Sequence, residues 1–288
     1  MRTSPVVALL PFTFCSTLLA QGGPAPSSVS LLAGWNVEFS PPAGWRVART
    51  VGRVQMLASS SEPGSIFIAP GLYTSAEEAI SDLTALYTSM NLMAVPVEQP
   101  AQALIAGLRA TVATYDSQDQ TMRHVRARFI NLLGAHGTGL NLLAMTTPEH
   151  FDRLRYTLER LAATVQVGAP IVNQAAVEAL SGTWVLSSRE RGPDASSAGG
   201  ARAHDESIAF DGRGAFHWRS SPLASADGRI AAASPFASAG GVPENGDHGR
   251  YVVIGNTLIL RGQKGQFTFD VALDGNRLIA LGRTYVRP

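Results

Sequence analysis

The sequence predicts an α+β protein of two domains, in which an antiparallel sheet flanked by helices is followed by an antiparallel up-and-down β-barrel. Two amphipathic helical patterns lie before residue 167, among runs that alternate between apolar and polar residues. A break at Gly168-Ala-Pro170 follows, and beyond Gly182 only short alternating runs between turn residues remain. We therefore expect an α/β sandwich over residues 30–167, a linker over 168–180 and a barrel over 181–288.

Residues 1–26 have the order of a secretory signal peptide. Arg2 supplies a positive charge, the apolar run from Val6 to Ala20 carries no charge, and a polar stretch with prolines follows. The run is shorter and more broken by proline than the about 20 residues that a membrane span needs. We expect cleavage between Ala20 and Ala25, no integral membrane segment afterwards, and export to the periplasm or the extracellular space.

The amino-acid composition argues against several kinds of site in the exported part of the chain. Cys15, the only cysteine, lies in the export segment, so we expect no disulfide, no thiolate nucleophile and no cysteine zinc site in the mature chain. Of the 23 Lys and Arg residues one is Arg2, which leaves 22 basic against 22 acidic residues. A chain with balanced charge lacks the excess of positive charge that attracts nucleic acid. We expect no nucleic-acid partner, and export argues against cytosolic nucleotide cofactors, so no cofactor is expected.

Two helices are predicted in the first domain. Ser75-Ala-Glu-Glu78 matches a capping box at the start of a helix over residues 75–89. A second helix begins at Thr147-Pro148-Glu149, because proline is favoured at the first helical position. The apolar residues of each share one face, namely Ala79, Ile80, Leu83, Leu86, Tyr87 and Met90 in the first and Phe151, Leu154, Leu158 and Leu161 in the second. Two such helices need a sheet to cover.

The strands of that sheet are predicted from period-2 patterns. They are 35–39, 54–58, 65–69, 93–97, 108–115, 123–133 and 139–145, with a further polar strand after Trp45. In the last three, apolar residues alternate with more polar ones, which is typical of antiparallel strands that differ in burial between their faces.

The barrel is predicted from seven short runs and the turns between them. The runs are 183–188, 207–210, 215–220, 250–254, 257–261, 267–273 and 277–286. Tight turns at 255–256, 263–265 and 274–275 join the later ones, and closure would hide the sheet edges. Residues 175–180 read as a short helical connector, and the Gly-, Ala- and Ser-rich stretches 191–202 and 220–247 read as long loops.

The first domain resembles the PsbP/Mog-like α/β sandwich family. The resemblance rests on Pro42-Ala-Gly-Trp45, on the strand Glu62-Pro-Gly-Ser-Ile-Phe-Ile68 and on the helix start Thr74-Ser-Ala-Glu-Glu78. It covers about residues 30–167. The family has no shared catalytic residues and is used mainly for binding and for assisting other proteins, which implies a binding or accessory role.

The second domain resembles a lipocalin or calycin barrel. Gly182-Thr-Trp184 stands where such barrels open with Gly-x-Trp, and Phe210-Asp-Gly-Arg-Gly-Ala-Phe216, Gly249-Arg-Tyr251 and the closing Gly282-Arg-Thr-Tyr-Val-Arg287 fit the same pattern. The resemblance implies that an arginine stacks on Trp184 and plugs one end of the barrel, and either Arg283 or Arg287 is placed to do so. Seven predicted strands, rather than eight, and the lack of a following helix depart from the pattern.

Aromatic residues are the candidate lining of the barrel. Side chains two apart on a strand point the same way, which groups Phe216 with Trp218 and Phe267 with Phe269. With Trp184, Phe210 and Tyr251 they would form a lumen for a small apolar ligand. The alternative is a filled core, since barrels near eight strands can be packed by side chains alone.

No catalytic or metal site is predicted. The six histidines, at 124, 136, 150, 204, 217 and 248, contain no pair with the i, i+4 spacing of ligands on one helix face. Gly-x-Ser-x-Gly is absent, and Glu77-Glu78 are explained by the helix dipole.

We therefore expect an exported, non-enzymatic binding or accessory protein. Its barrel would hold a small apolar ligand, and its α/β domain would dock an envelope or protein partner. Two alternatives stay open at this point. One is a hydrolase or isomerase with an unrecognised site, and the other is a structural or assembly factor whose domains are both fully packed.

Overall fold

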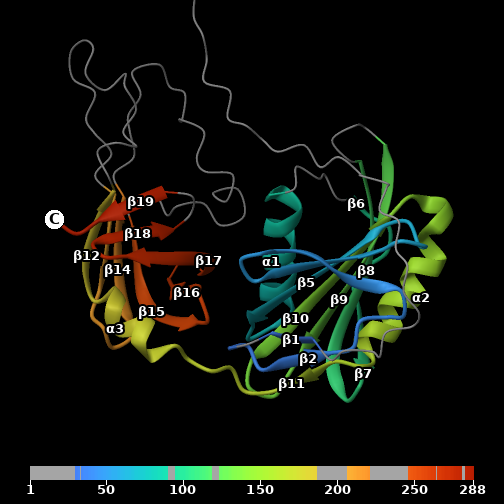
Figure 1. Ribbon diagram of the computed structural model, residues 1–288, viewed down its shortest axis with the longest axis horizontal. Helices are drawn as coiled ribbons and strands as arrows, with labels where there is room; N and C mark the ends of the chain where they lie inside the picture. Colours follow the sequence, from blue (N-terminus) through green and yellow to red (C-terminus); the bar gives the residue numbers. More distant parts are fainter. Residues whose placement is uncertain are drawn as a thin grey trace, which may run out of the picture.

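The computed structural model describes residues 30–32, 34–89, 95–118, 123–186, 206–220, 246–263, 265–280 and 283–288. Within them, antiparallel sheets with three α-helices are followed by a closed antiparallel barrel (Figure 1), so the predicted fold class is confirmed. The export segment 1–26, the loop stretch 191–202 and most of 220–247 lie outside these residues.

The first part of the chain forms an eight-stranded antiparallel sheet and a small three-stranded one. In spatial order the large sheet is β3 (Trp45–Val51), β4 (Val54–Ser59), β5 (Ser65–Leu72), β10 (Thr138–Thr146), β9 (His124–Leu133), β8 (Leu108–Gln118) and β6 (Val95–Pro96), with β7 (Ala101–Ile105) also paired to β8. The small sheet is β1 (Ser30–Leu32), β2 (Val37–Phe39) and β11 (Gln166–Val167). Strands β1, β7 and β11 were not predicted.

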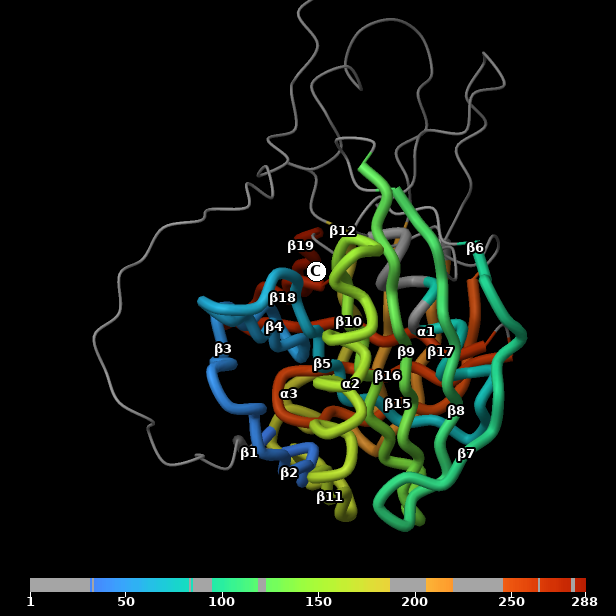
Figure 2. Tube along the Cα trace, turned by 90° about the vertical axis from the view of Figure 1, so that its right-hand side faces the viewer, coloured from blue at the N-terminus to red at the C-terminus, as the bar shows by residue number. Residues whose placement is uncertain are grey.

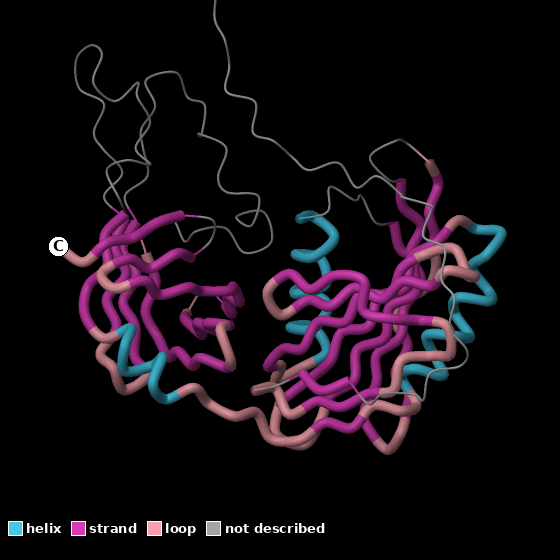
Figure 3. Tube along the Cα trace, viewed as in Figure 1, coloured by secondary structure: helices cyan, strands magenta, loops and turns pink. Residues whose placement is uncertain are grey.

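Helices cover both faces of the large sheet (Figure 3). On one face, α2 (Phe151–Ala162), entered through the 3-10 turn η1 (Pro148–His150), buries all four of its predicted apolar residues. On the other, α1 (Ala76–Ser89) begins with the predicted capping box: Glu78 N donates to Ser75 Oγ (3.3 Å), and Thr74 N donates to the Glu78 carboxylate (2.6 Å). Alternate residues of β9 serve the two faces, Ile130 and Leu132 on the α2 side and Ala127 and Phe129 on the other.

The second part is a closed barrel of eight strands. They are β12 (Gly182–Leu186), β13 (Glu206–Phe210), β14 (Ala215–Ser220), β15 (Asp247–Ile254), β16 (Thr257–Gly262), β17 (Gly265–Asp274), β18 (Arg277–Ala280) and β19 (Arg283–Val286). The prediction of seven strands was wrong, because the last predicted run is two strands. Ala280 pairs with Arg283, so the chain reverses between these residues and supplies the strand that closes the barrel onto β12.

The short helix α3 (Gln174–Leu180) covers one end of the barrel. Asn173 caps it by accepting a hydrogen bond from Ala176 N (3.1 Å), and Val177 and Leu180 are buried in the barrel core. Strands β12, β14, β16 and β18 all end at the opposite end of the barrel (Figure 1), which we call the loop end. The barrel therefore has a helix-covered end and a loop end.

The two parts share one hydrophobic core. Ile254 and Ile259, on the outer side of the barrel, are fully buried in the same cluster as Leu32, Trp35 and the α2 side of the large sheet. Polar contacts surround this apolar centre: Arg261 and Gln266 donate to Leu72 O (3.3 and 2.8 Å), and Asn173 donates to Gly255 O (2.9 Å). Figure 2, turned by 90° from Figure 1, shows the barrel strands β15–β17 lying behind the sheet.

Candidate functional site

The predicted lumen aromatics come together in the interior of the barrel. Trp184, Phe210, Phe216, Trp218, Tyr251 and Phe269 are buried in one cluster, and Phe267 is partly buried against it. Phe210 meets Tyr251 edge to face at 4.8 Å between ring centroids, and Trp218 meets Phe267 at 5.9 Å. These rings pack on one another and on aliphatic residues, so most of the interior is filled by side chains.

Arg287 lies over Trp184 at the helix-covered end. Its guanidinium carbon is 4.5 Å from the indole centroid, and its Nη2 donates to Ala179 O (2.6 Å) and Ser181 O (3.0 Å). Trp184 Nε1 donates to Leu180 O (2.7 Å). The Tyr251 hydroxyl donates to Val177 O (3.0 Å), so this end is closed by hydrogen bonds as well as by rings.

Arg283, the other candidate for the plug, lies at the loop end instead. It pairs with Glu206 (2.5 Å), which is 2% exposed, and the Tyr285 hydroxyl donates to the second Glu206 oxygen (2.6 Å). Burial, and then the Glu206 carboxylate, raise the pKa of Tyr285 far above its usual range, so Tyr285 stays a donor. The sequence reasoning missed this charged group, although Glu206, Ile208 and Phe210 alternate on one face of their strand.

Trp218, on the neighbouring strand β14, has an unused hydrogen-bond donor. It pairs across the ladder with Ile208, two residues from Glu206 along β13, and it is 1% exposed. Its Nε1–H is buried and has no hydrogen-bond partner. A buried N–H without an acceptor costs about 1–3 kcal/mol. The loop end of the barrel therefore combines the Trp218 and Phe267 rings, the ion pair of Arg283 with buried Glu206, and the unsatisfied Trp218 N–H.

A second polar group is buried in the α/β domain, beneath α1. Arg53 donates to the Asp82 carboxylate (2.6 Å), whose other oxygen accepts from the Tyr73 hydroxyl (2.6 Å). Asn141 donates to the Tyr73 oxygen (2.8 Å), and Asn131 donates to Asn141 (2.8 Å). Burial, and then Asp82, raise the pKa of Tyr73 well above its usual range. Because these groups satisfy one another, they hold α1 to the sheet and leave little for a ligand.

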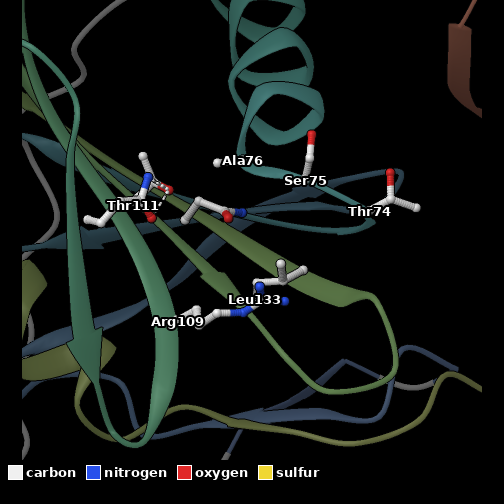
Figure 4. Close-up of a pocket in the computed structure, with 8 residues that line it drawn as sticks. Thr74, Ser75, Ala76, Arg109, Thr111 and Leu133 are labelled. Atoms are coloured by element: carbon white, nitrogen blue, oxygen red, sulfur yellow. Dashed lines mark hydrogen bonds between the residues drawn. The ribbon is translucent and has the colours of Figure 1, made fainter.

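A shallow polar pocket of about 70 Å³ opens at the start of α1 (Figure 4). Figure 4 shows Thr74 and Ser75 where α1 begins, and Arg109, Thr111 and Leu133 on the sheet near it. The Gln102 and Thr111 side chains hydrogen bond to each other (3.2 Å). The volume is well below the about 300 Å³ at which pockets for drug-sized ligands begin, so the pocket suits water or a small ion.

The described histidines offer no buried base. His124, His136, His150, His217 and His248 are all exposed, and His204 lies outside the described residues. His124 contacts Asp116 (3.3 Å) at the sheet surface. Across the described ranges, no three His, Cys, Asp or Glu residues gather to hold a metal. No helix in the same ranges is long and apolar enough to cross a membrane.

Comparison with known proteins gave structural similarities only. No protein-family model matches the sequence, and no curated protein matches it. Among solved structures, the chain is similar to the cyanobacterial PsbP protein CyanoP from Synechocystis sp. PCC 6803, at 15% identity and a TM-score of 0.34, over 52% of this chain and 99% of that one. It is also similar to PA94, a protein of unknown function from Pseudomonas aeruginosa, at 14% identity and a TM-score of 0.30, over 50% of this chain and 97% of that one. The lipocalin resemblance of residues 181–288 stays a prediction.

Proposed function

We propose that the chain is an exported, non-enzymatic binding protein whose barrel takes a small, mostly apolar ligand at its loop end. The observation that carries the proposal is the buried Trp218 Nε1–H, which has no hydrogen-bond acceptor. The Trp218 ring packs on Phe267, and Trp218 is the cross-strand partner of Ile208, two residues from Glu206. A ligand with one hydrogen-bond acceptor would satisfy this donor while its apolar part packs against Phe267 and Trp218.

Native mass spectrometry of the protein purified from its own host, followed by organic extraction, tests the ligand. A noncovalent adduct is expected, and Trp218→Phe should reduce its occupancy because the donor is lost. Trp45→Phe is the matched control, since Trp45 is also buried with an unpartnered Nε1 but lies in β3. An empty chain, with no change in tryptophan fluorescence on adding hydrophobic probes, would exclude a ligand of this kind.

We also propose that the α/β domain docks an envelope or protein partner along the edge formed by β6 and β7. Val95, Val97 and Leu104 are all more than half exposed on this one edge. Exposed apolar residues gathered on an open sheet edge favour pairing with another protein. Pull-down from envelope extracts should lose the same partner on Leu104→Asp but keep it on Ile279→Asp, which changes an exposed isoleucine of the barrel. Equal recovery with both variants would exclude this edge.

A further inference from the structure

Two histidines lie side by side on the outer surface of the barrel. His217 in β14 and His248 in β15 are direct cross-strand partners, although they are far apart in the sequence. Their rings are stacked, with centroids 6.3 Å apart and planes inclined by 28°, and both side chains are exposed. Directly opposed residues have Cβ atoms about 4.5–5.5 Å apart, a distance that two imidazoles bridge through one ion after small rotations.

The Nε2 atoms of both rings act as acceptors. His217 Nε2 accepts a hydrogen bond from Arg219 Nε (3.2 Å), and His248 Nε2 lies 3.4 Å from the Gln263 side-chain nitrogen, which can only donate. An imidazole nitrogen that accepts a hydrogen bond carries the lone pair that a metal ion uses. The pair therefore presents two imidazole nitrogens at the surface, each next to a donor that solvent can replace.

The chemistry of these ligands selects the ion. Imidazole nitrogen suits Zn²⁺, Cu²⁺ and Ni²⁺, whereas Ca²⁺ and Mg²⁺ require oxygen ligands. Gln263 adjoins His248 and offers an amide oxygen after rotation, and water completes the coordination. No third His, Cys, Asp or Glu joins the pair among the described residues, and the Arg219 guanidinium repels a cation, so binding is expected to be weak and exchangeable.

We propose that His217 and His248 form a two-imidazole site for a borderline divalent transition-metal ion, Zn²⁺, Cu²⁺ or Ni²⁺, that clips β14 to β15. These two strands are joined in the chain by residues 221–246, so the ion adds a direct link between them at the loop end of the barrel. Because the site exists only when the strands are paired, ion binding stabilises the folded barrel. The site lies outside the barrel and does not depend on the ligand proposed above.

Titration of the full chain with Zn²⁺ by calorimetry, and with Cu²⁺ by electron paramagnetic resonance, tests the site. We expect one ion per chain, nitrogen hyperfine coupling in the Cu²⁺ spectrum and a higher melting temperature with Zn²⁺. The double variant H217A/H248A should lose at least about tenfold in affinity. H136A/H150A, which removes two exposed histidines elsewhere, should bind as the wild type does.

A further variant tests the arrangement of the ligands. Arg219→Gln removes the guanidinium that occupies His217 Nε2, so it should tighten Zn²⁺ binding severalfold. Equal affinity of wild type and H217A/H248A, or no binding by the wild type at millimolar Zn²⁺, would overturn the proposal. A loss of affinity in H136A/H150A equal to that in H217A/H248A would also overturn it, because the ions would then bind without regard to the pair.

Discussion

Arg287 joins three parts of the barrel through a single side chain. Its guanidinium covers the Trp184 ring and donates to the carbonyls of Ala179, in the last turn of α3, and Ser181, the residue between α3 and β12. The planar, five-donor fork of arginine serves both purposes at once, whereas lysine offers a point charge. One exposed residue near the end of the chain therefore fixes the helix that covers the barrel.

Replacing Arg287 tests this role. Arg287→Ala should lower the free energy of unfolding by about 1–3 kcal/mol, because the stacking contact and two hydrogen bonds are lost. Arg287→Lys should lower the free energy of unfolding by less than Arg287→Ala does. Urea unfolding followed by tryptophan fluorescence measures the change, and Arg277→Ala, which removes another exposed barrel arginine, should leave the midpoint unchanged. A loss in Arg277→Ala as large as that in Arg287→Ala would refute the assignment.

At the scale of the element, β15 and β16 approach closely at Gly249. A Cβ added there would lie 2.0 Å from Arg261 O, which is backbone and cannot move aside without shifting the strand. Gly249→Ala should therefore destabilise the barrel by at least about 1–3 kcal/mol. Gly275→Asn is the control, since Gly275 (φ 58°) has open space around it and asparagine tolerates that conformation. Thermal unfolding of both variants decides the matter, and equal melting temperatures would contradict the expectation.

The pairing of β8 with β9 includes a salt bridge whose effect depends on pH. Arg126 donates to both Asp116 oxygens (2.7 and 3.0 Å), which lowers the pKa of Asp116 below its usual value. A lowered pKa in the folded state adds stability above the unfolded pKa of about 3.8, and this stability is lost as the pH falls through the folded pKa.

Asp116→Asn should therefore be less stable than the wild type at about pH 7, by about 0.2–1 kcal/mol for a pair at the surface. The difference should disappear in acid, below the pKa of the folded carboxyl. Urea unfolding across this pH range measures it. Asp274→Asn, an exposed carboxylate of the barrel, is the control, and a difference that persisted in acid would have to come from something other than the charge.

How far the sequence predicts the elements depends on burial. The period-2 and period-3.6 patterns located α1, α2 and most strands, because their apolar residues recur at the spacing of a strand or a helix. Strand β7 was not predicted, because four of its five residues are exposed and its sequence does not alternate between apolar and polar residues. The aromatic interior was predicted from the alternation of side chains along each strand. This alternation does not show which residue a buried charge pairs with, because Glu206 and Arg283 are 77 residues apart in the sequence. A test for helical histidine spacing likewise overlooks a cross-strand pair such as His217 and His248.

At the scale of the whole molecule, the shared core couples the two domains. Ile259 and Leu258 are neighbours on β16 that point in opposite directions, Ile259 into the core shared with the first domain and Leu258 into the barrel. Both are fully buried, so truncating either to alanine should cost about 2–5 kcal/mol. The two substitutions differ in the contact they weaken: Ile259→Ala weakens the packing between the domains, and Leu258→Ala weakens the packing inside the barrel.

Calorimetry separates these two effects. The wild type should unfold in one transition, Leu258→Ala in one transition at lower temperature, and Ile259→Ala in two transitions, because only the latter weakens the contact between the domains. Two well-separated transitions in the wild type would show that the shared core does not couple them.

The isoleucines buried between the two parts also bear on how such a barrel can be inherited. A gene segment encoding residues 181–288 alone would produce a protein with Ile254 and Ile259 facing water, and these residues are fully covered only when the preceding sheet is present. Recombination that moved the barrel to another protein would therefore have to replace this apolar spot or bring a new neighbour for it. The two halves are consequently expected to change sequence together during evolution, rather than to be exchanged as independent modules.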